Sequence, residues 1–576
     1  MLTNALLAGA LGASYLTVLA LQLNPHVPLF SDTTWRWFAT LGLFYGVHLA
    51  ALFYLLMMAR EFFSLEPLSP GWASVRVLAW LAAALAAAAS ALMWLNVRGF
   101  EAALGETATR RMTAGAAATS ASTVVLLGIA VAHYSFGRRG SRVGASLFAM
   151  AAFGSIALPL AARGPAVPDE PLPSGAPVAR HEEGAARRVV MILLDGASLE
   201  YIWPQAAAGR LPNFARLLET GATLDLATVR PTGPGPVWAS AATGVYPDRT
   251  GVRSGAHYLA WGARQPLDLL PDHCFSHALV HLGAVRQLRS SSEAWRSRPV
   301  WDILSAAGMR VGVVRWPLTY PAPGVDGFVV SDRYHELIGS MGELGAAASP
   351  PATLPIVRAA FEDAAAEARP LVAPAVAGGP RPDAPEVQAG RRDAAYSLTM
   401  RELRARGEVQ FAALRYQGLD TIGHYYMGDT QPAMVGDPDD HDRREHVEVL
   451  GRYYAYIDAE IGEAMDALAR EDLLLVVSGF GMQRQNPLKQ IAGRLLGDPD
   501  MTGTHDRAPD GFLLAYGADV ASGRLQRGSI VDITPTVLYY LGLPVGRHMD
   551  GYARTDLFTR EFTADRPITY IASYDR

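Results

Sequence analysis

Five long segments without Asp, Glu, Lys or Arg dominate the first 163 residues of this chain of 576 residues. They cover residues 1–31, 37–59, 77–97, 112–137 and 143–162. Each supplies about 20 mostly apolar residues, the length that an α-helix needs to cross a bilayer. Buried core helices or a cleavable signal peptide are the alternatives, but the first segment lacks the basic start of a signal peptide. We therefore expect a transmembrane domain of five helices over residues 1–163.

The arginines between these segments divide almost evenly between the two membrane faces, so their local density must decide the orientation. Arg138, Arg139 and Arg142 lie in one short connection, and short loops rich in arginine face the cytoplasm. An odd number of spans then places the chain after Arg163 on the other side. We expect an integral membrane protein that contacts the lipid bilayer and has an extracytoplasmic C-terminal domain, as in a bacterial inner membrane.

A second domain begins after a Pro- and Ala-rich linker at residues 164–188. Uninterrupted apolar runs predict strands at 189–194, 311–314, 410–416, 473–477 and 512–516, and helical patterns lie between them at 212–218, 300–307 and 448–468. Alternating strands and helices predict an α/β three-layer sandwich with a mostly parallel central sheet over residues 189–576. The Ala- and Pro-rich stretch within 339–400 is predicted to be an inserted cap.

Metal-ligand residue types gather next to the ends of these predicted strands. Asp195 follows the first strand, Asp420 and His424 follow the strand at 410–416, and His505 precedes the strand at 512–516. In α/β sheets the chemistry gathers at the carboxyl ends of the strands. One such residue alone is usually an ordinary surface residue, but the four together in this order indicate a metal site.

Six sequence blocks carry a resemblance to a known family. They are LLDG at 193–196, PNFARLL at 212–218, WASAATGVYP at 238–247, DTIGH at 420–424, GTH at 503–505 and DITPT at 532–536. With them the domain resembles the alkaline phosphatase superfamily, specifically its type I phosphodiesterase and nucleotide pyrophosphatase branch. The helices before the domain also resemble the layout of membrane-bound members that transfer phosphoethanolamine or phosphoglycerol.

The resemblance implies two metal ions, usually zinc, which act with a Thr or Ser nucleophile. Asp420, His424 and His505 match all three ligands of one metal, and two imidazoles with one carboxylate are typical of a catalytic zinc. For the other metal only Asp195 matches, because Ser478-Gly479-Phe480 stands where the family carries Ser-Asp-His. We therefore expect one divalent metal, either zinc or manganese, and the loss of the second metal site.

The nucleophile expected from the resemblance is also replaced. Pro234 occupies the position at which the family carries Thr or Ser, and proline has no hydroxyl group that could attack phosphorus. Thr232, two residues earlier, is the candidate nucleophile if this Gly- and Pro-rich loop follows a different path.

Two functions remain open on these residues. The first is a membrane-anchored hydrolase or transferase that acts on a phosphate or sulfate ester of an envelope lipid or glycan with a single-metal site. The alternative is a catalytically inactive pseudoenzyme that serves as a binding or scaffolding module at the cell envelope. The net charge of −5 argues against broad binding of nucleic acid.

Overall fold

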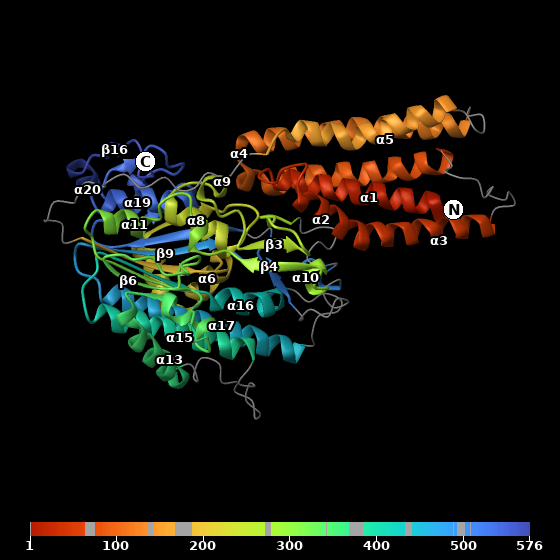
Figure 1. The fold of residues 1–576 in the computed structure, drawn as a ribbon. Coiled ribbons are helices and arrows are strands. Elements are labelled where there is room, and N and C mark those ends of the chain that lie inside the picture. Colours follow the sequence, from red (N-terminus) through yellow and green to blue (C-terminus); the bar gives the residue numbers. More distant parts are fainter. Residues whose placement is uncertain are drawn as a thin grey trace. The chain divides into compact units, whose positions relative to one another are not determined.

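The computed structural model describes residues 2–63, 75–135, 142–166, 187–270, 278–340, 342–367, 384–431, 440–487, 489–491, 501–506 and 509–575. The chain forms two compact units, drawn in Figure 1. The helical unit comprises Met1–Glu170 and Ala256–Arg289, and the α/β unit comprises Pro171–Gly255 and Ser290–Arg576. Arg138 and Arg139, most of the predicted linker and part of the predicted cap lie outside the described residues.

Long apolar helices make up most of the helical unit. In chain order they are α1 (Leu2–Leu23), α2 (Asp32–Leu41), the π-helical turn η1 (Gly42–Gly46), α3 (Val47–Phe63), α4 (Val75–Ser135) and α5 (Arg142–Arg163). Four helical stretches among the described residues are long and apolar enough to cross a membrane, namely Leu2–Leu23, Asp32–Ala59, Val75–His133 and Arg142–Arg163.

Helix α4 folds back on itself at Gly105, whose φ of +70° interrupts the helical backbone. The Ser90 and Ser120 hydroxyl oxygens lie 2.7 Å apart, and the Trp94 indole N–H donates to the Ser120 hydroxyl at 3.1 Å. The two arms of α4 therefore lie against each other in opposite directions. The expected count of five spans remains a prediction.

A hairpin from the middle of the sequence belongs to the helical unit, which the sequence had not indicated. Strands β3 (Ala256–Ala260) and β4 (Val285–Arg289) pair antiparallel, and their apolar residues form one buried cluster with residues of α1 and α2. The buried Asn24 side chain adds three hydrogen bonds, since it donates to the Leu269 carbonyl and accepts from the Asp268 and Leu269 N–H groups. The chain thus crosses between the two units more than once.

The α/β unit contains a sheet of ten strands in the order β13-β2-β12-β9-β1-β8-β5-β6-β7, with β14 also paired to β2. These strands are β1 (Arg188–Leu194), β2 (Ala222–Ala227), β5 (Val311–Val314), β6 (Gly327–Val330), β7 (Ala348–Ser349), β8 (Phe411–Tyr416), β9 (Asp472–Phe480), β12 (Asp510–Tyr516), β13 (Gly523–Arg524) and β14 (Gly528–Ser529). Two small sheets pair β10 (Gln483–Arg484) with β11 (Gly503–Thr504) and β15 (Val545–Gly546) with β16 (Tyr570–Ile571).

The large sheet is mixed, so the prediction of a mostly parallel sheet is not confirmed. Strand β1 is parallel to both of its neighbours, β8 and β9. Strand β12, however, runs antiparallel to β9 and to β2. The C-terminal ends of β8, β1 and β9 therefore lie at one end of the sheet. Strand β12 begins at that same end and runs in the opposite direction.

Helices cover both faces of this sheet, as Figure 1 shows. Met191 and Leu193 of β1 belong to one buried cluster, whereas Ile192 and Leu194 belong to the other, as alternation along a strand requires. The first face carries α8 (Pro234–Thr243), α11 (Val300–Ala306) and α19 (Ile533–Tyr540). The second carries α6 (Leu199–Ala207), α7 (Pro212–Thr220), α15 (Pro385–Arg404), α16 (Gly418–Tyr426) and α17 (Asp440–Asp466). Shorter or peripheral helices of this unit are α9 (Pro247–Thr250), α12 (Tyr334–Leu337), α13 (Leu354–Glu367) and α20 (Arg560–Asp565), whereas α10 (Ala278–His281) belongs to the helical unit.

Candidate metal centre

Asp420, His424 and His505 lie together at the edge of the sheet where β8 ends. Asp420 and His424 are four residues apart on α16, so they share one face of the helix. The Asp420 Oδ1 atom lies 3.6 Å from His424 Nε2 and 3.9 Å from His505 Nε2. Potential ligand atoms of all three residues lie within 4.8 Å of one another. The structure therefore brings together the three side chains that the sequence predicted as ligands of one metal.

His505 reaches this position because a short segment binds directly to α16. The Thr502 N–H donates to the His424 carbonyl at 2.8 Å, and His424 Nδ1 lies 3.0 Å from the Gly503 carbonyl oxygen. A Cβ atom on Gly503 would lie only 2.1 Å from the Gly423 carbonyl oxygen. Glycine at 503 is therefore required for this close approach.

The polar atoms of this group fit a bound cation. The contact of His424 Nδ1 with a carbonyl places the ring proton on Nδ1, which leaves the Nε2 lone pair directed toward Asp420. Asp420 Oδ1 is buried and has no hydrogen-bond partner among the described residues. A buried carboxylate oxygen without a donor is costly, and a divalent cation held by these three residues would remove that cost.

Asp195 does not join this group, because other side chains use both of its oxygens. The carboxylate is fully buried. Its Oδ2 accepts from Arg415 Nε at 2.9 Å and also from Arg415 Nη2, while its Oδ1 accepts from the Trp238 indole N–H at 2.6 Å. Burial raises the pKa of Asp195, and the Arg415 guanidinium opposes that rise. The role of Asp195 as a metal ligand stays a prediction. In the structure its carboxylate forms an ion pair with Arg415.

Arg415 is the important residue that sequence reasoning missed. It lies on β8 beside Leu193 of β1, and its side chain is 5% exposed. The positive charge of Arg415 acts on Asp195, Asp332 and Asp420. The signal was present in the sequence, because a single arginine in the apolar strand FAALRY must be buried with a partner when that strand lies in the middle of a sheet.

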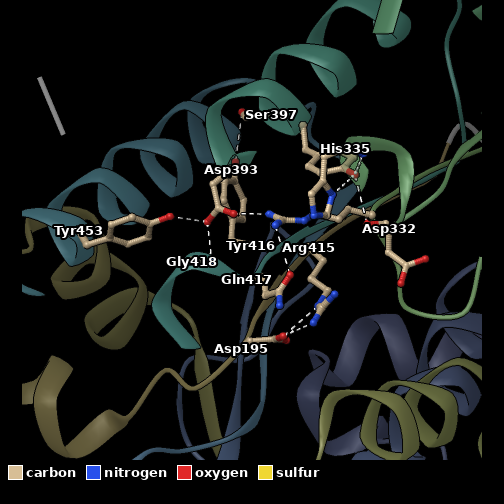
Figure 2. Close-up of polar contacts among 12 residues, drawn as sticks. Asp195, Asp332, His335, Asp393, Ser397, Arg415, Tyr416, Gln417, Gly418 and Tyr453 are labelled. Atoms are coloured by element: carbon tan, nitrogen blue, oxygen red, sulfur yellow. Dashed lines mark hydrogen bonds and ion pairs between the residues drawn. The ribbon is translucent and has the colours of Figure 1, made fainter. Parts of the chain in front are cut away.

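A buried polar network fixes the start of α16 and thus the position of Asp420. Asp393 of α15 accepts from the Gly418 N–H at 3.0 Å, from the Tyr453 hydroxyl at 2.7 Å and from Arg315. Figure 2 shows Asp393 between Tyr453 and Gly418, with the Asp195–Arg415 pair nearby. Asp393 is completely buried, and through these bonds it ties the first residue of α16 to Tyr453 of α17.

Comparison with known proteins assigns the α/β unit to a family. The profile of the family described as type I phosphodiesterase / nucleotide pyrophosphatase matches residues 189–518, more than half of the chain. The chain belongs to this type I phosphodiesterase family. Members of the family depend on metal ions, typically zinc. A comparison with curated proteins finds no match.

Solved structures similar to this chain include murine ectonucleotide pyrophosphatase / phosphodiesterase 5. Its free form has a TM-score of 0.39 and 14% identity, and the match covers 65% of this chain and 100% of the murine chain. An inactive variant of the same murine protein in complex with AMP has a TM-score of 0.39 and 13% identity over the same shares of the two chains.

Packed side chains occupy the region where the second set of metal ligands was expected. A Cβ atom on Gly479 would lie 2.4 Å from Val237 Cγ1 and 3.4 Å from Trp238 Cζ2. The ring of Phe480 lies 4.9 Å from the ring of His505, measured between centroids. A side chain at position 479 would therefore require the Val237 side chain to shift. The two replacements are accommodated by packing and are not simply missing ligands.

The predicted nucleophile region lies at the start of α8. Pro234 is the first residue of the helix, and Gly233 is its N-cap. Thr232 is 8% exposed, and its hydroxyl has no hydrogen-bond partner among the described residues. The Thr232 hydroxyl is thus uncommitted, and its role as nucleophile remains a prediction.

We predict that Arg415→Met strongly destabilises the α/β unit, because it leaves the Asp195 carboxylate buried without its guanidinium. At pH 7 the free energy of unfolding should fall by about 3–5 kcal/mol. Without Arg415 the pKa of Asp195 rises further above its unfolded value, so protonation favours the folded state. The difference in the free energy of unfolding between the wild type and Arg415→Met should therefore become smaller as the pH falls through that raised pKa. Chemical denaturation followed by near-UV circular dichroism at several pH values measures it.

Arg216→Met is the matched control, since Arg216 pairs with Asp466 at 3.0 Å on the surface, where the Asp466 side chain is 73% exposed. This variant should lose no more than about 1 kcal/mol. The double variant Asp195→Asn/Arg415→Met should recover part of the loss at pH 7. An Arg415→Met variant as stable as Arg216→Met at neutral pH would contradict the assignment.

Proposed function

We propose that this protein is a membrane-anchored, metal-dependent phosphodiesterase-like hydrolase or phosphotransferase that uses one divalent metal ion, zinc or alternatively manganese. The observation that carries this proposal is the group of Asp420, His424 and His505, in which a buried Asp420 oxygen has no hydrogen-bond donor among the described residues. Membership in the type I phosphodiesterase family supports phosphate esters as the substrate class.

The balance of buried charge also favours one metal ion. Asp195, Asp332 and Asp420 all lie within the electrostatic reach of Arg415. Three carboxyl groups thus share one guanidinium in a poorly solvated region, where burial raises the pKa of Asp195 and of Asp332. A single divalent cation at Asp420, His424 and His505 would stabilise the charged form of these carboxyl groups. A second dication would need further carboxylate ligands, and Gly479 and Phe480 supply none.

The side chains of the site have different roles. A bound divalent ion supplies Lewis acidity, which polarises a phosphate ester and activates water. Arg415 is bound by Asp195, so it serves as a fixed internal positive charge and not as a flexible substrate ligand. Trp238, Val237 and Phe480 exclude water from the part of the site that they fill. We propose water as the attacking group, with the Thr232 hydroxyl as the alternative.

Membrane anchoring is supported by the four apolar helical stretches in the first 163 residues. We propose insertion into a bacterial inner membrane with the α/β unit on the extracytoplasmic side. An envelope lipid or glycan that carries a phosphate or sulfate ester is the substrate that fits this location. Asp195 serves as the ion-pair partner of Arg415. We propose no second metal ion.

The alternative function is an inactive binding or scaffolding module at the envelope. Two observations favour it: proline replaces the nucleophile at 234, and Asp195 is already paired with Arg415 and Trp238. Both changes affect the same half of the site. The half formed by Asp420, His424 and His505 keeps its ligand types, which favours a retained metal over a relic that has lost residues throughout.

We predict about one zinc or manganese ion per chain in the purified full-length protein, measured by elemental mass spectrometry. The variant Asp420→Ala/His424→Ala should lose it, with affinity reduced about 100-fold or more, since even outer-shell partners of metal ligands contribute about 10–100-fold. Asp466→Asn, which changes an exposed carboxylate on α17, should keep the metal. The enzyme proposal fails if the wild-type protein binds no metal when zinc or manganese is supplied.

We predict metal-dependent hydrolysis of a generic phosphodiester such as bis(4-nitrophenyl) phosphate by the loaded full-length protein. Asp420→Ala/His424→Ala should abolish it. Thr232→Ala should retain activity within about tenfold if water is the attacking group, since a missing covalent nucleophile costs far more. Loss of activity in Thr232→Ala with its metal content unchanged would identify Thr232 as the nucleophile. A metal-loaded protein without turnover on any phosphate or sulfate ester would support the binding module.

A further inference from the structure

One arginine is buried inside the helical unit, at the last residue of α5. Arg163 is 3% exposed. Its Nε donates to the Leu21 carbonyl at 2.7 Å, and its Nη2 donates to the Asn24 carbonyl at 2.9 Å and to the Val27 carbonyl. These carbonyls lie at and just after the C-terminal end of α1, where a positive charge is favourable. Arg163 therefore fixes the end of α5 to the end of α1.

These carbonyl groups leave some buried polar atoms around Arg163 without a hydrogen-bond partner among the described residues. Arg163 Nη1 is buried and has no partner among the described residues. Gln22, which follows Leu21 on α1, is 3% exposed, and neither its Nε2 nor its Oε1 has a partner among those residues. Buried polar atoms in native proteins are normally satisfied, so these three atoms point to an additional hydrogen-bonding group.

A second arginine contacts the backbone at Arg163. Arg111, on the second arm of α4, donates to the Arg163 carbonyl at 3.3 Å. Its Cζ would be 3.3 Å from a Cβ atom on Gly164. Arg111 is also the charged group that acts on the Arg163 guanidinium. Among the described residues neither arginine forms an ion pair with a carboxylate, so two like charges, one of them buried, stand without an opposite charge.

Gln22 belongs to the same place in the bundle. A Cβ atom on Gly115 would lie 2.2 Å from Gln22 Nε2 and 3.5 Å from the Pro159 carbonyl oxygen. Gly115 is one helical turn after Arg111, and Pro159 is one turn before Arg163. The unpartnered amide and both guanidiniums thus lie within about one turn of each other, where α1, α4 and α5 meet.

We propose that Arg163, Arg111 and Gln22 form a binding site for a phosphate group in the helical unit. Two guanidiniums match a phosphate in charge and geometry, and the Gln22 amide N–H supplies a further donor. The apolar helices around the site favour the headgroup phosphate of an anionic phospholipid as the source. This site is separate from the metal centre and does not rest on the proposed catalytic function.

The test uses the full-length protein, delipidated in a neutral detergent, and follows its thermal unfolding midpoint. Dioctanoyl phosphatidylglycerol at roughly ten times its Kd should raise the midpoint by about 2–4 °C. Dioctanoyl glycerol, which has the same acyl chains but no phosphate, should leave the midpoint unchanged. Glycerol 3-phosphate, at the same phosphate concentration, distinguishes a soluble phosphate from a lipid headgroup.

The variant Arg111→Gln should lose most of the phosphatidylglycerol shift, because it removes one guanidinium and keeps the Arg163 contacts that hold α5 to α1. Arg110→Gln is the matched control. It removes the same charge from the neighbouring position, where the Arg110 side chain is 72% exposed and lies 3.7 Å from Glu106, and it should keep the full shift. Gln22→Leu should raise the midpoint of the lipid-free protein, because it removes two unpartnered polar atoms, and should reduce the shift.

A midpoint that responds to phosphatidylglycerol but not to glycerol 3-phosphate identifies a lipid headgroup site. Equal responses to both compounds identify a site for free phosphate esters, and the proposed chemistry still stands. The proposal is overturned if dioctanoyl glycerol produces the same shift as phosphatidylglycerol. It is also overturned if phosphatidylglycerol produces no shift, or if Arg111→Gln and Arg110→Gln respond alike.

Discussion

The buried ion pair between Arg415 and Asp195 is the interaction on which the ends of the central strands depend. It joins the two neighbouring central strands β1 and β8 at the edge of the sheet where both end. A buried carboxylate is tolerated only with a partner, and here the partner is a side chain of the protein itself. Both Asp195 oxygens accept hydrogen bonds from protein side chains. Apolar residues can therefore stand at positions where the family carries metal ligands.

The remaining half of the site is built independently of that pair. Asp393 holds the start of α16 through Gly418 and Tyr453, and Gly503 lets the segment with His505 approach the helix closely. These contacts position Asp420, His424 and His505, and the ring of Phe480 packs against that of His505. A single metal ion is therefore compatible with a protein in which Val237 and Trp238 pack against Gly479 and Arg415 pairs with Asp195.

The sequence predicted the local elements well because strong local signals encode them. The strand at 311–314 has the observed bounds, since a short apolar run between helices can only be buried. The spacing of Asp420 and His424 placed both on one helical face. The strand at 512–516 was predicted, but its antiparallel direction was missed, because nothing local in an apolar run specifies direction. Likewise, the alternating pattern of β3 indicates one apolar face but not that this face covers α1 and α2.

The clearest test of a single-metal centre is anomalous diffraction from crystals of the zinc-loaded protein, recorded at the zinc absorption edge. The account predicts one anomalous peak between Asp420, His424 and His505, with Asp195 still paired to Arg415. Two peaks about 3.5–4 Å apart, the separation found in two-metal hydrolases, with the second bound by Asp195, would contradict it.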